Sequence, residues 1–269
     1  MKKILIIAFA VMAMVSCTSE KKQDADETKV LVLYYSQTNA TKAVAEEIQR
    51  WMNADIESID VTMPYDGDFQ QTIERCQKEM ADGTVPELVP LKSDLTNYDL
   101  IFIGYPVWFG TYAPPVAALL KAVDLSGKTI VPFCTFGSGG LNTSTDDLKK
   151  ALPDADIRAG YGVRNARLAA MPEEVEHFLK AYEYVDGEVE HLIDYAEEQP
   201  VTEEETAIFE AACGNYPMLH ATPVTVGRRG TSKGVDYLYT AEENGKMLKV
   251  KVTVSNEEGA VPEFTEVIR

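Results

Sequence analysis

The sequence predicts a three-layer α/β sandwich built on a parallel sheet, followed by a small α+β unit. Three observations lead to this fold class. Short β-branched runs alternate with amphipathic stretches, an acidic span without periodicity follows, and apolar residues then alternate with polar ones. The chain has 269 residues, of which 45% are hydrophobic, so it can bury one large core or two modest ones.

Five strands, each followed by a helix, are expected between residues 29 and 184. The first run, Val30 to Tyr35, is of the kind that a parallel sheet buries on both faces. Pro114 and Pro115 suit the first turn of a helix, where a missing amide costs nothing. The predicted strands are 30–35, 56–61, 100–104, 129–135 and 157–163, and the predicted helices are 40–52, 69–80, 116–123, 143–152 and 172–182.

A boundary is expected after residue 182, because residues 183–205 hold ten acidic residues and no Lys or Arg. Thr202 and Glu205 form a capping box that predicts a helix to about Cys213. Beyond it the hydrophobic period becomes two, with strands expected at 224–226, 235–239, 248–254 and 264–268. Residues 187–269 therefore form a small α+β domain whose topology loosely resembles the cystatin-like fold. We expect it to act in docking or interaction.

The N-terminus has the pattern of an export signal. Lys2 and Lys3 precede an uncharged stretch, 4–15, that is too short to span a bilayer as a mature helix. The ending Met14-Val15-Ser16-Cys17 resembles the lipobox of bacterial lipoproteins, which implies that residues 1–16 are removed and Cys17 is lipidated. An ordinary secretory signal is the alternative. Residues 17–28 are predicted to be a flexible tether, so the protein would be exported and would contact a bacterial membrane only through its lipid, in the periplasm or at the cell surface.

Composition excludes several other functions. The formal net charge of -18 would be repelled by phosphate backbones, so nucleic-acid binding is not expected. The cysteines lack metal-ligand or disulfide spacing, and Cys76, Cys134 and Cys213 are expected to be buried as small hydrophobes. The three histidines lie far in sequence from the loops described next, and we expect none of them to be catalytic.

Three loops at the carboxyl ends of predicted strands could form one binding site. The first offers hydroxyls and helix-start amides without Lys or Arg, which suits a single terminal phosphate, although a simple helix cap would give the same pattern. The second is aromatic and suits a flat ring, although a hydrophobic plug or a partner patch would also fit. The third is rich in glycine, so its backbone can approach a ligand. These loops are 36–41 (SQTNAT), 105–112 (YPVWFGTY) and 135–140 (TFGSGG).

The runs VLVLYYSQTNATKAVAEEI, YDLIFIGYPVWFGTYAPPV and SGKTIVPFCTFGSGG together resemble the flavodoxin family, in its bacterial type with a Tyr-Pro-x-Trp-x-Gly loop. The resemblance covers about residues 29–182 and implies the strand order 2-1-3-4-5 with FMN at the point where the strand order reverses. It departs at Asn39, where such families usually have glycine, but asparagine tolerates a positive φ.

Carried over residue by residue, the resemblance implies three groups of FMN contacts. Hydroxyls and amides of the first loop would hold the phosphate, the second loop would line the isoalloxazine with Trp108 packing on the ring, and the third would offer amides to its polar edge. Tyr65 could reach over the site. The implied cofactor-binding residues are Ser36, Gln37, Thr38, Asn39, Ala40, Thr41, Pro106, Val107, Trp108, Phe109, Gly110, Thr135, Phe136, Gly137, Ser138, Gly139 and Gly140.

The resemblance implies an electron carrier that exchanges electrons with an unidentified redox partner protein, because the flavin supplies the redox chemistry and the sequence offers no nucleophile beside a base. Two alternatives stay open. One is an FMN-dependent NAD(P)H or quinone oxidoreductase, which would need a second, basic nucleotide pocket. The other is a binding module that has lost the cofactor.

Overall fold

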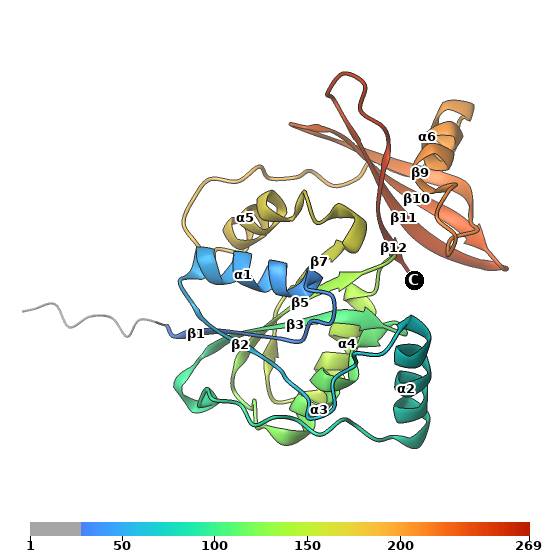
Figure 1. Ribbon diagram of the computed structural model, residues 1–269. Helices are drawn as coiled ribbons and strands as arrows, with labels where there is room; N and C mark the ends of the chain where they lie inside the picture. Colours follow the sequence, from blue (N-terminus) through green and yellow to red (C-terminus); the bar gives the residue numbers. More distant parts are fainter. Residues whose placement is uncertain (1–27) are drawn as a thin grey trace, which may run out of the picture.

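The computed structural model describes residues 28–269, which form a parallel-sheet domain followed by an antiparallel-sheet domain (Figure 1). The predicted signal peptide, the lipidation site Cys17 and nearly all of the tether lie outside the described residues. Within residues 28–269, no helix is long and apolar enough to cross a bilayer.

The first sheet has the order β2-β1-β3-β5-β6, with β7 also paired to β5. Counted by parallel strands, this is the predicted order 2-1-3-4-5, and the pairings along this path are parallel. The strands are β1 (Val30–Tyr34), β2 (Asp55–Ser58), β3 (Leu100–Trp108), β5 (Thr129–Phe136), β6 (Asp156–Ile157) and β7 (Tyr161–Arg164), and a short β4 (Thr111–Tyr112) folds back on β3.

Helices cover both faces of this sheet, as the alternation of strands and helices predicts. Helices α1 (Ala40–Met52) and α5 (Met171–Ala181) lie on one face, and α3 (Pro114–Ala122) and α4 (Leu141–Ala151) lie on the other, with α2 (Phe69–Asp82) beside α3 (Figure 1). Short 3-10 turns occur at Leu95–Asn97 and Asn165–Arg167.

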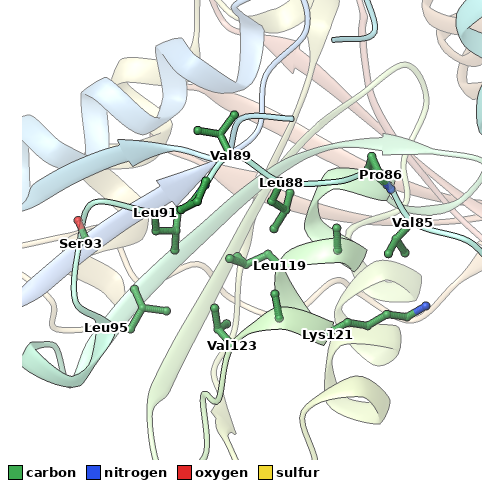
Figure 2. Close-up of a pocket in the computed structure, with 13 residues that line it drawn as sticks. Val85, Pro86, Leu88, Val89, Leu91, Ser93, Leu95, Leu119, Lys121 and Val123 are labelled. Carbon is green, nitrogen blue, oxygen red and sulfur yellow. The ribbon is translucent and has the colours of Figure 1, made fainter. Parts of the chain in front are cut away.

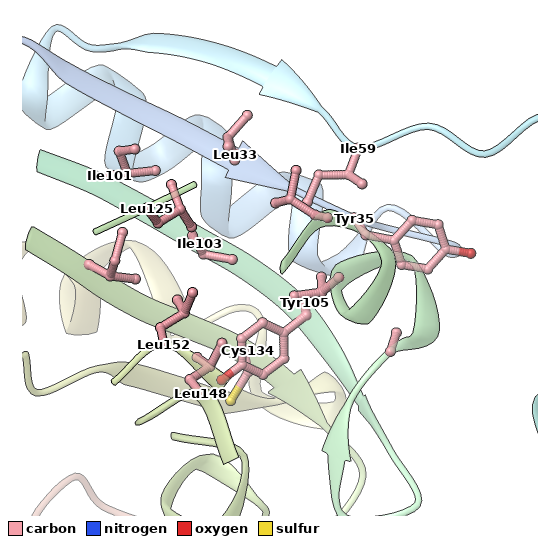
Figure 3. Close-up of a cluster of buried hydrophobic side chains, with 14 of the residues drawn as sticks. Leu33, Tyr35, Ile59, Ile101, Ile103, Tyr105, Leu125, Cys134, Leu148 and Leu152 are labelled. Atoms are coloured by element: carbon pink, nitrogen blue, oxygen red, sulfur yellow. The ribbon is translucent and has the colours of Figure 1, made fainter. Parts of the chain in front are cut away.

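Each face of the sheet has its own apolar core. On the α3 and α4 side, Leu33, Ile101 and Ile103 project from the strands and are fully buried (Figure 3). On the α1 and α5 side, Val32 and Phe102 pack against helix residues such as Ile48. Alternate residues of one strand thus enter opposite cores, which is why the strand sequences are apolar throughout.

The fifth predicted strand, 157–163, forms as two pieces, β6 and β7. The carbonyl of Ile130 in β5 accepts from the amide of Arg158, 2.9 Å away. Residues two apart in a strand direct their backbone N–H and C=O groups to the same neighbouring strand. Pro132, two residues after Ile130, therefore faces the fifth strand as well, but a proline has no amide to donate to it. A side-chain carbon at Gly160 would lie 2.4 Å from the Pro132 carbonyl oxygen. The strand therefore leaves the sheet opposite the proline and rejoins it at Tyr161.

The second domain is an antiparallel sheet of order β12-β11-β10-β9-β8 that packs on one helix. Its core is built from residues such as Phe209 of the helix and Tyr239 and Val250 of the sheet. The prediction of a helix followed by four strands is correct, and its likeness to the cystatin-like fold stays a prediction. The elements are β8 (Gln199–Pro200), α6 (Glu203–Cys213), β9 (Thr222–Thr231), β10 (Gly234–Glu243), β11 (Lys246–Ser255) and β12 (Glu263–Ile268).

Candidate functional site

The first loop leads from β1 into the start of α1, and it leaves its polar groups largely unpaired. Asn39 caps the helix with φ 65, as expected of an asparagine at a position that favours glycine, and its side chain makes no capping hydrogen bond. Within residues 28–269, no hydrogen bond uses the amides of residues 36–41. The positive end of the helix dipole and these free amides suit an anion.

The three hydroxyls of this loop have different surroundings. The Oγ of Ser36 is buried and has no hydrogen-bond partner within the described residues. Thr38 is exposed, whereas Thr41 is buried and its hydroxyl oxygen lies 2.9 Å from that of Thr135. Ser36 and Thr38 are therefore free to bind a ligand, and Thr41 ties the first loop to β5. A buried unpaired hydroxyl is costly, so Ser36 is a site that a ligand oxygen would satisfy.

Gln37 holds the neighbouring loop in place. Its side-chain amide donates to the carbonyl of Tyr65, at 2.8 Å, and to the hydroxyl of Thr72, at 3.1 Å. The backbone amide of Gln37 is free to bind a ligand, whereas its side chain is already hydrogen-bonded to Tyr65 and Thr72. Tyr65 is thereby brought close to the first loop, and only 4% of its surface is exposed.

The second loop is the turn between β3 and β4, and its aromatic residues separate into two environments. Phe109 and Gly110 form a two-residue hairpin turn with φ 52 and 85, and Phe109 is half-exposed. Trp108 packs edge-to-face on Tyr35 and Tyr65, with ring centroids 5.8 and 5.3 Å away. Trp108 thus belongs to an aromatic cluster beside the first loop, while Phe109 lies outside this cluster and is half-exposed.

The tyrosines of this cluster stay protonated at neutral pH. Burial raises the pKa of Tyr35 to about 12. Burial, followed by the hydrogen bond to Glu79, raises the pKa of Tyr65 still further. The Tyr65 hydroxyl is engaged with Glu79, and neither tyrosine exchanges protons near neutral pH.

The third loop follows β5, which includes Thr135 and Phe136 as buried strand residues, so the loop outside the strand is 137–140. Within residues 28–269, no hydrogen bond uses the amides of these four residues as donors. The carbonyls of Gly137 and Ser138 accept bonds from Arg164 and Val267, at 2.8 and 2.6 Å. The loop is therefore held through its carbonyls and keeps its amides free.

A cavity of about 390 Å³ lies between the second and third loops. Such a volume falls within the range of small-molecule sites. Its walls come from the hairpin turn, the third loop, the start of α4 and the second domain. They are Val107, Phe109, Gly110, Gly137 to Gly140, Asn142, Thr143, Tyr216, Met218 and Glu266 to Arg269.

A second hollow has a different character. It measures about 540 Å³ and lies between residues 85–95 and α3 (Figure 2). Leu88, Leu91 and Leu119 dominate its walls, and none of its lining residues belongs to the three loops. Because it lacks convergent polar groups, the cavity between the loops is the stronger candidate for a ligand site.

Seven of the predicted cofactor-binding residues line the 390 Å³ cavity, namely Val107, Phe109, Gly110 and Gly137 to Gly140. Pro106, Trp108, Thr135, Phe136 and the first loop, 36–41, do not line it, and the first loop is linked to β5 by the hydroxyls of Thr41 and Thr135. Sequence reasoning missed Arg164, Tyr216, Met218 and the end of β12, because they belong to the strand end and second domain that meet the third loop. None of the three histidines lines the cavity.

A doubly wound α/β sandwich with a phosphate-type cradle and a ring-sized cavity at the carboxyl ends of its strands defines a mononucleotide-binding class of protein. The chain belongs to the flavodoxin family, which matches residues 29–181.

Solved structures and a curated relative each resemble part of the chain. A candidate flavoprotein from Bacteroides eggerthii is 28% identical with a TM-score of 0.51, and the match covers 57% of this chain and 97% of that one. A flavoprotein from Lactobacillus acidophilus in complex with FMN is 25% identical with a TM-score of 0.47, over 50% and 93% of the two chains.

An NAD(P)H dehydrogenase (quinone) from Cupriavidus metallidurans is 33% identical over 95 residues, which is 35% of this chain. The matched segment covers 45% of the length of that relative.

Proposed function

We propose that this chain binds FMN at the three loops and works as an electron-transfer protein. The observation that carries the proposal is the unpaired buried Oγ of Ser36 beside the free amides of residues 36–41. These groups fit a phosphate monoester, because they supply several donors and a helix dipole without the glycine-lysine pattern of a triphosphate loop. The cavity beside the third loop would take the ring.

In this arrangement each part of the chain has one task. FMN, when bound, supplies the one-electron and two-electron redox chemistry. Ser36 and Thr38 bind the phosphate, the amides of 137–140 donate to the polar edge of the ring, and Val107 and Phe109 exclude water from it. The hydrogen bond between the Thr41 and Thr135 hydroxyls fixes the first loop relative to β5. The phosphate and the ring of one FMN molecule could therefore bind to the first and third loops at the same time.

The absorption spectrum of the purified protein, with and without added FMN, tests this proposal. We expect saturable binding accompanied by a shift of the visible flavin band. A protein that stays colourless and leaves the spectrum of saturating FMN unchanged would be a cofactor-free binding module instead.

A second candidate function is suggested by the curated relative that is an NAD(P)H dehydrogenase (quinone). An enzyme of that kind would accept hydride directly, so NADH or NADPH alone would bleach the bound flavin rapidly. The arginines of this region have acidic or carbonyl partners: Arg164 bonds to carbonyls, Arg167 pairs with Glu174 and Glu263 at 2.7 and 2.9 Å, and Arg269, which lines the cavity, pairs with Glu243 at 3.5 Å. This favours the electron carrier, for which the colour persists with either nucleotide.

We also propose that the protein is exported and lipid-anchored at Cys17 to a bacterial membrane. The pattern Lys2-Lys3, residues 4–15 and Met14-Val15-Ser16-Cys17 supports this. Metabolic labelling with a radioactive fatty acid should mark the wild-type protein and leave Cys17→Ser unmarked. Label on Cys17→Ser, or no label on either, would contradict the assignment.

A further inference from the structure

The second domain reaches into the carboxyl end of the parallel sheet through β12. Figure 1 shows β12 running from the antiparallel sheet to the region where β5 and β7 end. There the amide of Val267 donates to the carbonyl of Ser138, at 2.6 Å, and both Val267 and Phe264 are buried. The contact is therefore made on the third loop itself, next to the free amides of residues 137–140.

Arg164, at the end of β7, stabilises the contact between β12 and the third loop. Its Nε donates to the carbonyl of Gly137 at 2.8 Å, and its Nη1 donates to the carbonyl of Phe264 at 2.6 Å. The guanidinium also lies over the rings of Phe264 and Tyr216, at 3.9 and 5.0 Å from their centroids. One buried side chain thus joins the third loop to β12 and to Tyr216.

The glycines of the third loop fit this approach of the second domain. A side-chain carbon at Gly139 would lie 2.0 Å from the carbonyl oxygen of Val267, and one at Gly137 would lie 3.1 Å from the hydroxyl oxygen of Tyr216. The first distance is impossible for any residue but glycine without a backbone shift. The glycine-rich sequence therefore serves the contact between the domains as well as a ligand.

The contact leaves the 390 Å³ cavity open between the domains. Phe109 from the first domain and Met218 from the second are large apolar residues that are 50% and 69% exposed, and both line this cavity. Tyr216 adds an aromatic ring that packs on Phe264, with centroids 5.3 Å apart. An apolar aromatic wall thus faces the loops that would hold a flavin ring.

We propose that the second domain completes the flavin site: Tyr216 and Met218 form the wall opposite the second and third loops and contact the isoalloxazine ring. This inference rests on the proposed FMN binding. Arg164 acts as a positioning residue that holds the wall in place.

Flavin titrations of the full chain test this inference. We compare the wild type with the double variant Tyr216→Leu and Met218→Ala, using FMN and also riboflavin, which has the ring but no phosphate. The ring contact predicts that both flavins bind about tenfold more weakly to the variant, as expected for the loss of an aromatic contact and its buried area. A Thr38→Val variant should weaken FMN and leave riboflavin unchanged.

The matched control is the double variant Tyr182→Leu and Met247→Ala. These two residues are 52% and 56% exposed and lie outside the cavity, so flavin affinity should not change. Far-ultraviolet circular dichroism checks that each variant is folded.

Unchanged or tighter flavin binding in the Tyr216→Leu, Met218→Ala variant overturns the inference, and tighter binding would identify the second domain as a cover that competes with the cofactor. If no variant and no wild-type protein binds either flavin, the proposed function has failed together with this inference. That result is distinguishable, because the failure of the inference alone leaves wild-type FMN binding intact.

Discussion

The first and third loops both follow parallel strands and leave their backbone amides unpaired, but different groups hold them in place. Within the described residues, loop 36–41 makes side-chain hydrogen bonds to other segments through Gln37 and Thr41, and it leaves its amides and the Ser36 hydroxyl unpaired. Loop 137–140 is held by its carbonyls, which accept bonds from Arg164 and Val267. The difference indicates that the first loop is fixed only within its own domain, whereas the third loop also fixes the position of the second domain.

The largest effect that this comparison predicts concerns Arg164. The variant Arg164→Met leaves the buried carbonyl of Phe264 and the part-buried carbonyl of Gly137 without a charged donor, each bond contributing about 1.5–3 kcal/mol. We expect a loss of about 3 kcal/mol in the free energy of unfolding, measured by urea denaturation.

As a control, Arg158→Met removes a surface ion pair with Asp156, in which both side chains are more than half exposed, and should change stability by less than about 1 kcal/mol. Equal effects of the two substitutions would show that Arg164 does not join the domains.

A smaller effect is expected at Gly139. In Gly139→Ala the new carbon meets the Val267 carbonyl oxygen, so β12 must move away from the third loop, at a cost of about 1–3 kcal/mol. The variant should become more sensitive to limited proteolysis near the end of the chain.

Gly230→Ala is the matched control, because a side-chain carbon there meets nothing within 4 Å. Proteolysis of Gly139→Ala at the wild-type rate would argue against a tight contact between the third loop and β12.

The sequence predicted most of the first domain, because each strand buried on two faces is apolar throughout and each helix carries an apolar stripe. It predicted the three loops by their places after strands. The break between β6 and β7 could not be foreseen, since it depends on which neighbour Pro132 faces in the sheet. The role of Arg164 was equally hidden, because its partner Phe264 is 100 residues away and no local pattern marks such a contact.

A substitution at Ser36 in the first loop should not lower the stability of the ligand-free protein, in contrast to substitutions at the third loop. In Ser36→Ala the unpaired buried hydroxyl disappears, so the protein without ligand should be as stable as the wild type or slightly more stable. FMN should bind about tenfold more weakly, since a hydrogen bond to a charged phosphate contributes about 1.5–3 kcal/mol.

Thr41→Val provides the contrast within the same loop. It leaves the buried Thr135 hydroxyl unpaired and should lower the stability without ligand by about 1 kcal/mol. A loss of stability in Ser36→Ala with no change in FMN affinity would make Ser36 a structural residue and remove the main support for the phosphate cradle.

The smallest predicted effect is a pH dependence that lies in the second domain, away from both loops. Hydrogen bonds from Lys249, Thr225 and Thr240 lower the pKa of Glu198 to about 2. Because the carboxyl is more acidic in the folded state, its contribution is fully present above its ordinary pKa of 4.5 and is lost as the pH falls toward 2. Urea denaturation at pH 6 and pH 3 should show a smaller decrease for Glu198→Gln than for the wild type, and an equal decrease would mean that these bonds do not stabilise the ionised carboxylate.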